Sequence, residues 1–321
     1  MSTLVLVGEA SKKGRPYLKT VLDSAWTVVD FDAAAPERLT AVAAIGMPAG
    51  LRWKEQLPAL KFLQLSSAGL DGLDFALLPS GCRVSNVYEH EASIAEYVFT
   101  ALFELENQGW ISRAQNGFKK GEWLHLDRIG HPPRPTVCGK RIGIIGYGHI
   151  GRRCAEIATA LNMKVTVHTR TKPADKVELA ATVEDLAKIS DYLLVACPET
   201  PETRALVGEN ALSLLPANAI VINIARGPVI EEQALFEALS TKRIGGAILD
   251  VWYQYPSSAA ELRHGSRFAF HELDNVFLTP HLSAHTPEMV ERRWTFMAAN
   301  LNRFLKNQPL LNPVADAGVK A

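Results

Sequence analysis

The stretch Ile142-Gly143-Ile144-Ile145-Gly146-Tyr147-Gly148-His149-Ile150-Gly151 decides the fold class of this chain. Residues 142–145 form a short Ile-rich run, which is typical of a strand buried on both faces of a parallel sheet. A helical pattern follows from Arg153 to Leu161. The glycines in between have the spacing G-x-G-x-x-G at a strand-to-helix turn, which is the context that phosphate binding by a helix N-terminus requires.

Each glycine of this turn has its own expected role. Gly146 permits the tight turn, Gly148 lets a pyrophosphate approach the backbone, and Gly151 lets helix and strand pack closely. We therefore predict a dinucleotide-binding turn; the alternative is a turn of three glycines that holds no ligand. The predicted cofactor-binding residues of the turn are Gly146, Tyr147, Gly148, His149, Ile150 and Gly151.

Similar short apolar runs recur along the chain and alternate with longer helical patterns, which predicts an α/β fold built from βαβ units. A chain of 321 residues is too long for one small core and suggests two domains. The predicted strands cover residues 4–7, 27–31, 62–65, 142–145, 165–168, 193–196, 220–224, 247–249 and 276–278.

Two predicted long helices connect the domains. The first opens on the capping-box pattern Ser93-Ile94-Ala95-Glu96, and the second starts at Thr286-Pro287, an N-cap residue followed by proline at the first helical position. We predict a discontinuous substrate domain, residues 1–105 plus 287–321. It is interrupted by a dinucleotide-binding domain over residues 106–286.

The composition argues against several classes of partner. The chain has 34 basic and 34 acidic residues, so its formal net charge of zero gives no electrostatic reason to bind nucleic acid or an anionic membrane. No apolar run approaches the roughly 20 residues that span a bilayer. The four cysteines have no metal-ligand spacing, and reduced thiols suit a cytoplasmic protein. We expect no metal, no nucleic acid, no membrane and a cytoplasmic location.

The segment after the next predicted strand bears on the choice of cofactor. An NAD site places an acid there for the ribose 2′-hydroxyl, about 20 residues beyond the glycines. Here the segment is Thr169-Arg170-Thr171-Lys172, which contains no carboxylate. Thr169, Arg170 and Lys172 suit a 2′-phosphate, so we predict NADP(H). The alternative is a solvated basic loop, with Asp175 reaching back as the acid of an NAD(H) site.

At this point several motifs, in order, resemble the D-isomer-specific 2-hydroxyacid dehydrogenase family, in particular its glyoxylate/hydroxypyruvate reductases. The motifs lie at residues 146–151, 196–203, 223–227, 249–251 and 279–281. The resemblance implies two Rossmann-like or flavodoxin-like parallel-sheet domains, an active site in the cleft between them, and a homodimer. It also implies NAD(P)-dependent interconversion of a small 2-oxoacid and its D-2-hydroxy acid. The matched motifs add cofactor contacts at Cys197, Pro198, Thr203, Ile224, Ala225, Arg226, Asp250 and His281.

Reduction of a 2-oxoacid needs a cation for the carboxylate and a proton for the carbonyl oxygen. Arg226 follows a predicted buried strand at its carboxyl end, where α/β ligands bind, and it matches the substrate arginine of the family. His281 also follows a predicted strand and matches the general acid/base of the family, with an ordinary pKa suited to neutral pH. His285 is the local alternative for this role.

The loop Ser66-Ser67-Ala68-Gly69-Leu70-Asp71 resembles the one whose backbone amides hold the substrate carboxylate. Ala68 and Gly69 are the expected donors, because small residues allow close approach to the backbone. The alternative is an ordinary turn at the end of a strand. The basic segment 260–267 is longer than a connection needs. A solvated loop is the simpler interpretation, and contact with cofactor, substrate or a neighbouring subunit is the alternative.

One position departs from the family pattern. The family usually has a glutamate five residues after the aspartate at 250, where it pairs with the catalytic histidine; this chain has Tyr255. A phenol orients the ring without supplying charge, so we expect Tyr255 to orient His281 and the histidine pKa to be lower than in an acid-paired site. Two alternatives follow: a non-catalytic dinucleotide sensor, and an enzyme of the same fold that acts on another substrate.

Overall fold

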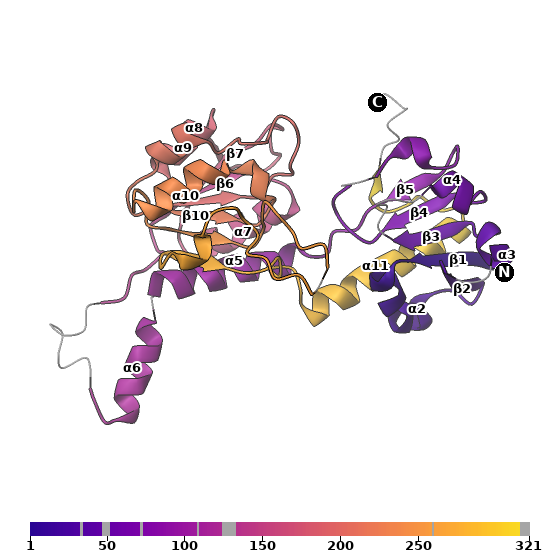
Figure 1. The fold of residues 1–321 in the computed structure, drawn as a ribbon, viewed down its shortest axis with the longest axis horizontal. Coiled ribbons are helices and arrows are strands. Elements are labelled where there is room, and N and C mark those ends of the chain that lie inside the picture. The colour runs from indigo at the N-terminus through magenta and orange to yellow at the C-terminus, as the bar shows by residue number, and fades with distance from the viewer. Residues whose placement is uncertain are drawn as a thin grey trace. The chain divides into compact units, whose positions relative to one another are not determined.

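The computed structural model describes residues 1–32, 35–46, 52–70, 73–107, 109–123, 133–258 and 260–314. The chain forms two compact units, which are coloured along the chain in Figure 1. Unit 1 comprises residues 1–90 and 285–321, and unit 2 comprises residues 91–284. Each is an α/β unit with a mainly parallel sheet, so the predicted class of two parallel-sheet domains is confirmed.

The described part of unit 2 has a seven-stranded sheet in the order β12-β11-β10-β9-β6-β7-β8, with every neighbouring pair parallel. Its central strands are buried on both faces, which explains their continuous apolar sequences. The strands are β6 (Arg141–Ile145), β7 (Lys164–His168), β8 (Glu178–Leu179), β9 (Tyr192–Val195), β10 (Ile220–Asn223), β11 (Gly246–Leu249) and β12 (Val276–Leu278).

Helices cover both faces of this sheet (Figure 1). α5 and α7 pack together on one core, whereas α8, α9 and α10 pack on the other. The helices of unit 2 are α5 (Glu91–Asn107), α6 (Trp110–Lys119), α7 (His149–Ala160), α8 (Val183–Ile189), α9 (Glu209–Leu214) and α10 (Glu232–Ser240), with 3₁₀ turns η3 (Gly227–Val229) and η4 (Phe270–Glu272).

The described part of unit 1 has a six-stranded sheet in the order β13-β5-β4-β3-β1-β2, in which only the β13–β5 pair is antiparallel. The strands are β1 (Ser2–Val7), β2 (Trp26–Asp30), β3 (Ala43–Gly46), β4 (Phe62–Leu65), β5 (Arg83–Ser85) and β13 (Pro313–Val314). The helices are α1 (Glu9–Lys13), α2 (Arg15–Val21), α3 (Ala35–Leu39), α4 (Trp53–Gln56) and α11 (Pro287–Leu305), with the 3₁₀ turn η1 (Phe75–Leu77).

The long C-terminal helix α11 closes one face of the unit 1 sheet. Its buried residues, Trp294 and Leu301 among them, share a core with Leu4 and Phe62 of the strands. The helix begins as predicted: Thr286 is the N-cap, its Oγ1 accepts a hydrogen bond from the Met289 N–H at 3.2 Å, and proline occupies the first position.

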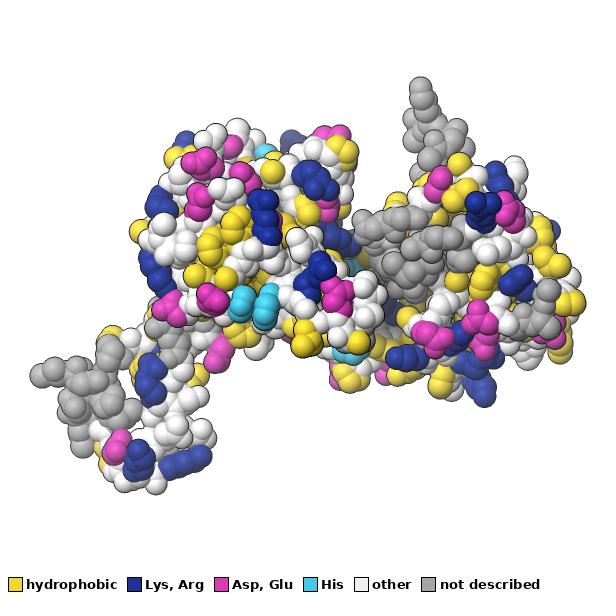
Figure 2. All heavy atoms as spheres, in the orientation of Figure 1, with side chains coloured by type: hydrophobic (Ala, Val, Ile, Leu, Met, Phe, Trp, Pro, Cys, Tyr) yellow, Lys and Arg dark blue, Asp and Glu magenta, His cyan; other side chains and the backbone are white. Residues whose placement is uncertain are grey.

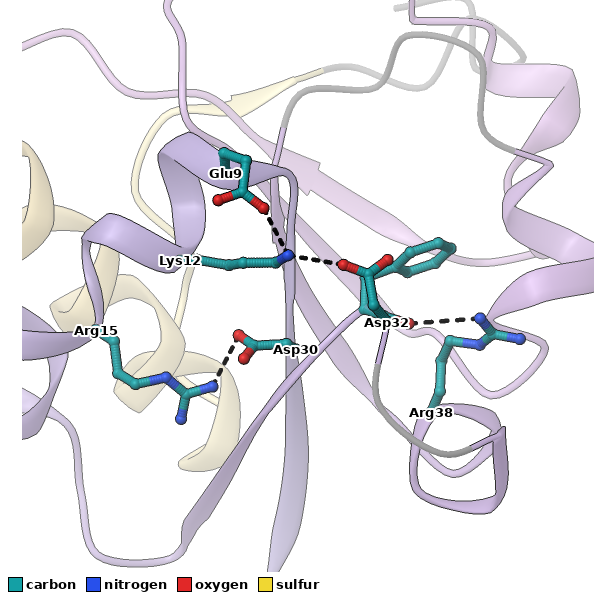
Figure 3. A network of polar contacts seen from close by, with 7 residues as sticks. Glu9, Lys12, Arg15, Asp30, Asp32 and Arg38 are labelled. Atoms are coloured by element: carbon teal, nitrogen blue, oxygen red, sulfur yellow. Dashed lines mark hydrogen bonds and ion pairs between the residues drawn. The ribbon is translucent and has the colours of Figure 1, made fainter.

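A polar network joins the first two helices of unit 1 to the end of β2 and to α3 (Figure 3). Lys12 Nζ lies 2.7 Å from both Glu9 Oε1 and Asp32 Oδ2. Arg15 pairs with Asp30 at 2.8 Å. Arg38 donates to the carbonyl of Phe31 and lies over its ring. These are partly exposed contacts, so they orient the segments more than they stabilise them.

The structure differs from the sequence-based expectations in two helical details. α5 begins at Glu91, and Ser93 is buried inside the helix, so the predicted capping box at Ser93 is wrong. Residues 91–105, which we assigned to the first domain, belong to unit 2, because α5 packs on α7. Each predicted strand is found to within two residues at its ends, whereas β3, β5, β8 and β13 were not predicted.

Figure 2 shows basic and acidic side chains interspersed over the visible face, in keeping with the net charge of zero. Within the described ranges, no helix is long and apolar enough to cross a membrane. In the same residues, no three histidine, cysteine, aspartate or glutamate side chains form a group able to hold a metal ion.

Candidate active site

The glycine turn between β6 and α7 is built as the sequence predicts. Gly146 has φ +94° and its N–H donates to the carbonyl of His168 at 2.9 Å. A Cβ on Gly146 would lie 2.7 Å from the backbone nitrogen of Cys197, and a Cβ on Gly151 would lie 2.2 Å from the carbonyl oxygen of Gly146. The packing of the protein itself therefore requires glycine at both positions.

Gly148 is different, because no atom lies within 4 Å of the position that its Cβ would take. It is the N-cap of α7, and no side chain caps the helix there. The turn thus leaves open space beside Gly148, at the start of a twelve-residue helix. His149 and Ile150 form the first turn of α7, and Tyr147 lies beneath the guanidinium of Arg152, 5.4 Å from ring to Cζ.

The loop after β7 exposes Arg170 and Lys172 to solvent, with Thr169 partly exposed. Two carboxylates lie nearby, although the sequence of the loop showed none. Asp175 Oδ2 lies 3.9 Å from Arg152 Nε, beside the glycine turn. The pKa of Glu202 is lowered, mainly by a hydrogen bond from Thr200 and in smaller part by the charge of Arg170. The loop is basic, but it is not free of negative charge.

The segment after β9 is held by its own hydrogen bonds. Thr203 Oγ1 donates to the carbonyl of Pro198 and accepts from the Thr200 N–H, both at 2.7 Å. Cys197 is buried against Gly146, and burial raises the pKa of its thiol to about 11, so the thiol stays protonated. The glycine turn therefore packs against Cys197, and the hydrogen bonds of Thr203 hold the segment that follows it.

Arg226 follows β10 in a turn that Asn223 holds. The Asn223 side chain accepts from the Ala225 N–H at 3.1 Å and donates to the Arg226 carbonyl at 3.0 Å. Ile224 and Ala225 are buried, whereas Arg226 is partly exposed, with Nη1 donating to the Ala225 carbonyl at 2.7 Å. The guanidinium thus extends from a turn whose backbone is held by hydrogen bonds.

His281 and Tyr255 are in direct contact. Tyr255 Oη lies 3.0 Å from His281 Nδ1, and the same oxygen accepts the Trp252 N–H at 3.2 Å. His281 has a left-handed φ of +61°, which is unfavourable for a non-glycine residue and needs support from its surroundings. The contact leaves Nε2 as the ring nitrogen that Tyr255 does not engage.

The charge of Arg226 affects the pKa values of both His281 and Tyr255. Burial lowers the pKa of His281; the carboxylate of Asp250 opposes this shift, and the cation of Arg226 adds to it. Burial also raises the pKa of Tyr255, against the smaller effects of the Trp252 N–H and Arg226. The phenol therefore stays neutral at physiological pH, and the histidine favours its neutral form more than a free imidazole does.

Asp250 is fully buried and its oxygens are engaged by the protein. Oδ1 accepts from Thr279 Oγ1 at 2.6 Å and from the Leu282 N–H at 2.7 Å, and Oδ2 accepts from the Ser283 N–H at 3.0 Å. From the sequence we predict a cofactor contact for Asp250, whereas its hydrogen bond with Thr279 was not predicted. The available signal was an acid placed directly after a buried strand.

In unit 1, the loop after β4 presents two backbone amides. Asn86 Nδ2 donates to the Ala68 carbonyl at 2.8 Å, and Ser67 Oγ donates to the Gly69 carbonyl at 2.9 Å. Among the described residues, no group accepts a hydrogen bond from the N–H of Ala68 or Gly69. Asp71, the last residue of the predicted motif, lies outside the described residues.

The basic segment 260–267 makes contacts within unit 2. Arg263 pairs with Glu261, whose pKa falls to about 2, mainly through hydrogen bonds from Ser257. Arg267 pairs with Glu232 at 3.2 Å. Both arginines are thus engaged by neighbouring acids of the same unit.

Comparison with known proteins identifies the class. Residues 105–283 match the family described as D-isomer specific 2-hydroxyacid dehydrogenase, NAD binding domain. The chain is 34% identical over 266 residues to glyoxylate/hydroxypyruvate reductase A HPR2 of Arabidopsis thaliana, covering 80% of this chain and 79% of that protein. It is 32% identical over 263 residues to the glyoxylate reductase of Pyrococcus furiosus, covering 79% and 75%.

Solved structures share the fold over almost the whole chain. A 2-hydroxyacid dehydrogenase from Ketogulonicigenium vulgare matches with a TM-score of 0.79 and 24% identity, covering 98% of this chain and 99% of that one. An acyclic imino acid reductase in complex with NADPH and D-Arg matches with a TM-score of 0.73 and 26% identity, covering 98% and 100%. The chain belongs to the D-isomer specific 2-hydroxyacid dehydrogenase family. It is an NAD(P)-dependent oxidoreductase of that family.

The open space at Gly148 predicts a change in binding without a change in fold. Gly148→Ala fits the protein and should leave the melting temperature within about 2 °C of wild type, but should weaken NADPH binding about tenfold, roughly 1.4 kcal/mol. Fluorescence titration with NADPH and thermal unfolding measure the two effects. Gly151→Ala is the matched comparison and should lower the melting temperature. If Gly148→Ala binds NADPH as tightly as wild type, the turn does not bind the pyrophosphate.

Proposed function

We propose that the protein reduces a small 2-oxoacid to its D-2-hydroxy acid with NADPH, in the manner of a glyoxylate/hydroxypyruvate reductase. The observation that carries the proposal is the grouping of Arg226, His281 and Tyr255 at the carboxyl edge of the same parallel sheet whose strand β6 ends in the glycine turn. Relatives named glyoxylate and hydroxypyruvate reductases support the choice of substrate.

The chemistry supplied by a bound nicotinamide dinucleotide is hydride transfer to the carbonyl carbon of the substrate. Gly148 and the first amides of α7 would hold its pyrophosphate. Arg226 would bind the carboxylate and carbonyl oxygens of the substrate with its planar fork, which polarises the carbonyl. His281 would donate the proton from Nε2 to the oxygen as negative charge develops there. Ala68 and Gly69 would give their free N–H groups to the substrate carboxylate.

Tyr255 suits both protonation states of His281. When the ring is protonated, Nδ1–H donates to the phenol oxygen, which also accepts from the Trp252 N–H. When the ring is neutral after Nε2 has given up its proton, the remaining proton stays on Nδ1 and still donates to the phenol oxygen. The tyrosine therefore orients the ring throughout the reaction, but it adds no charge to favour the imidazolium.

The preference for NADPH rests on the loop after β7. Exposed Arg170 and Lys172, with the Thr169 hydroxyl, supply charge-assisted donors for a 2′-phosphate. An NADPH-dependent glyoxylate/hydroxypyruvate reductase of Sinorhizobium meliloti, solved with NADP and sulfate, shares the fold with a TM-score of 0.78 and 23% identity, covering 98% of this chain and 99% of that one. The NAD(H) alternative keeps one specific support, because Asp175 lies beside the turn, 3.9 Å from Arg152.

A homodimer is the proposed assembly, with α6 as part of its contact surface. Figure 1 shows α6 projecting from the body of unit 2. Ile111 and Phe118 on this helix, and Trp123 just beyond it, have exposed fractions of 63%, 61% and 59%. Such exposed apolar side chains on one arm favour burial against a second copy of the chain.

One substrate alternative has a specific support. The acyclic imino acid reductase shares the fold and is 26% identical, and Tyr255 stands where 2-hydroxyacid dehydrogenases usually have a glutamate. A reductase for 2-imino acids, formed from a 2-oxoacid and an amine, would use the same hydride and proton donors. A dinucleotide sensor without chemistry would have no use for the Arg226 and His281 pair.

The central prediction concerns turnover. NADPH oxidation followed at 340 nm should appear with glyoxylate or hydroxypyruvate, and Arg226→Ala should lower kcat/KM by about 10²–10³-fold, because the developing oxyanion loses its cation. Arg226→Lys should recover only part of this loss. The same panel is run with added amine. Activity only in its presence would favour the imino acid alternative, and turnover that survives Arg226→Ala with His281→Ala would contradict the site.

The cofactor prediction is a change in selectivity. Arg170→Asp should lower the ratio of kcat/KM for NADPH to that for NADH at least about tenfold, because a charge-assisted contact with the 2′-phosphate becomes a repulsion. Asp175→Asn is the comparison: if the NAD(H) alternative holds, this variant loses activity with NADH. A ratio that Arg170→Asp leaves unchanged would show the basic loop to be a solvated loop.

The role of Tyr255 predicts a shift in pH dependence. Tyr255→Glu places a carboxylate at Nδ1, which favours the imidazolium and raises the pKa of His281. Reduction requires the protonated ring, so the pH at which its rate falls should move upward relative to wild type. Tyr255→Phe, which keeps the ring and removes the hydrogen bond, should lower kcat. A pH profile that Tyr255→Glu does not move would refute the orienting role.

The assembly prediction concerns α6. Ile111→Asp together with Phe118→Asp should convert a dimer to a monomer, because two like charges cannot be buried unpaired at the contact. Light scattering after size-exclusion chromatography measures the mass. Leu262→Asp, at an apolar position that is 98% exposed, is the control and should leave the mass unchanged. A monomeric wild-type protein would contradict the proposed homodimer.

A further inference from the structure

A partly buried series of hydrogen bonds runs from α5 to the buried side chain of Asp250. Tyr97 Oη lies 2.6 Å from Thr279 Oγ1, and Thr279 Oγ1 lies 2.6 Å from Asp250 Oδ1. An ionised carboxylate only accepts, so the Thr279 hydroxyl donates to Asp250 and must accept from Tyr97. The direction of the series is therefore fixed: Tyr97 donates to Thr279, which donates to the carboxylate.

The carboxylate at the end of this series holds the turn that carries His281. Asp250 accepts the N–H groups of Leu282 and Ser283 on the far side of the histidine, and Thr279 lies on the near side. The Thr279 carbonyl also accepts from Trp252 Nε1 at 2.9 Å. The left-handed backbone of His281 is thus tied on both sides to one buried carboxylate.

We propose that Tyr97 and Thr279 are positioning residues for His281: by donating hydrogen bonds in series, they keep the buried carboxylate of Asp250 charged and in place. A buried carboxylate without enough donors tends to take up a proton, and its neighbours then shift. The inference rests on the proposed role of His281 as proton donor. It adds two side chains to the site, Tyr97 of α5 and Thr279 after β12.

The groups that act on His281 make the charge of Asp250 important. Tyr255 contacts Nδ1 but is neutral, and Arg226 disfavours the imidazolium. Among the described residues, Asp250 is the carboxylate whose charge favours it. Tyr255 stands where a glutamate would supply that charge in direct contact with Nδ1. The imidazolium form of His281 therefore depends on the charge of Asp250, which the hydrogen bonds of the fold hold in place.

The test measures the pKa of His281 by NMR titration of histidine ring signals without substrate, with the signal assigned by its loss in His281→Gln. Thr279→Val and Tyr97→Phe should both lower the pKa, Thr279→Val more strongly, and Thr279→Ser should restore it. In the reductase assay, Thr279→Val should lower kcat about tenfold and change the KM for the oxoacid less than about twofold.

Tyr192→Phe is the matched control. Tyr192 is buried in unit 2, and its hydroxyl donates to a carboxylate on α5, Glu106 Oε1, at 2.7 Å. Its loss should reduce stability but leave the His281 titration unchanged. If Thr279→Val and Tyr97→Phe titrate like this control, or raise the pKa, the positioning role is wrong; Tyr97→Phe decides alone if Thr279→Val does not fold. A wild type without reductase activity would instead overturn the proposed function, and the titration would still stand.

Discussion

The carboxylate of Asp250 is shielded from solvent, and a buried charge is tolerated only when donors occupy its lone pairs. Here the donors are one hydroxyl and two backbone amides of the segment that follows β12. Satisfying the charge therefore fixes the path of that segment. The unfavourable left-handed φ of His281 is one consequence, because the turn is held on both sides of the residue.

The parallel register of the unit 2 sheet brings the remaining groups to the same edge. Asn223 pairs with Leu249, and Leu249 pairs with Leu278, so β10, β11 and β12 end level with one another. Arg226, Asp250 and His281 each follow one of these strand ends. Side chains 24 and 31 residues apart in sequence thus lie at one edge because parallel strands place their carboxyl ends together.

This rule explains which parts of the site could be predicted from sequence. A polar residue after a buried apolar run is visible in the sequence, and both Arg226 and His281 satisfy that pattern. The contact of Tyr97 with Thr279 joins residues 182 positions apart, and no local pattern marks it. The strand β3 was missed for a local reason, since Ala43-Ala44-Ile45-Gly46 is short and weak in β-branched residues. The start of α5 was misplaced because tertiary packing buries Ser93, whose sequence pattern suggested a cap.

The tyrosine at position 255 separates two tasks that a glutamate would perform together. A carboxylate in contact with Nδ1 both orients a histidine and favours its charged form. In this chain the phenol of Tyr255 makes the contact, held in turn by the Trp252 N–H, while the negative charge lies in the buried Asp250. A buried charge is screened less by salt than an exposed one. The proposed mechanism therefore links the protonation of His281 to the internal hydrogen bonds of unit 2, among them the one between Tyr97 of α5 and Thr279.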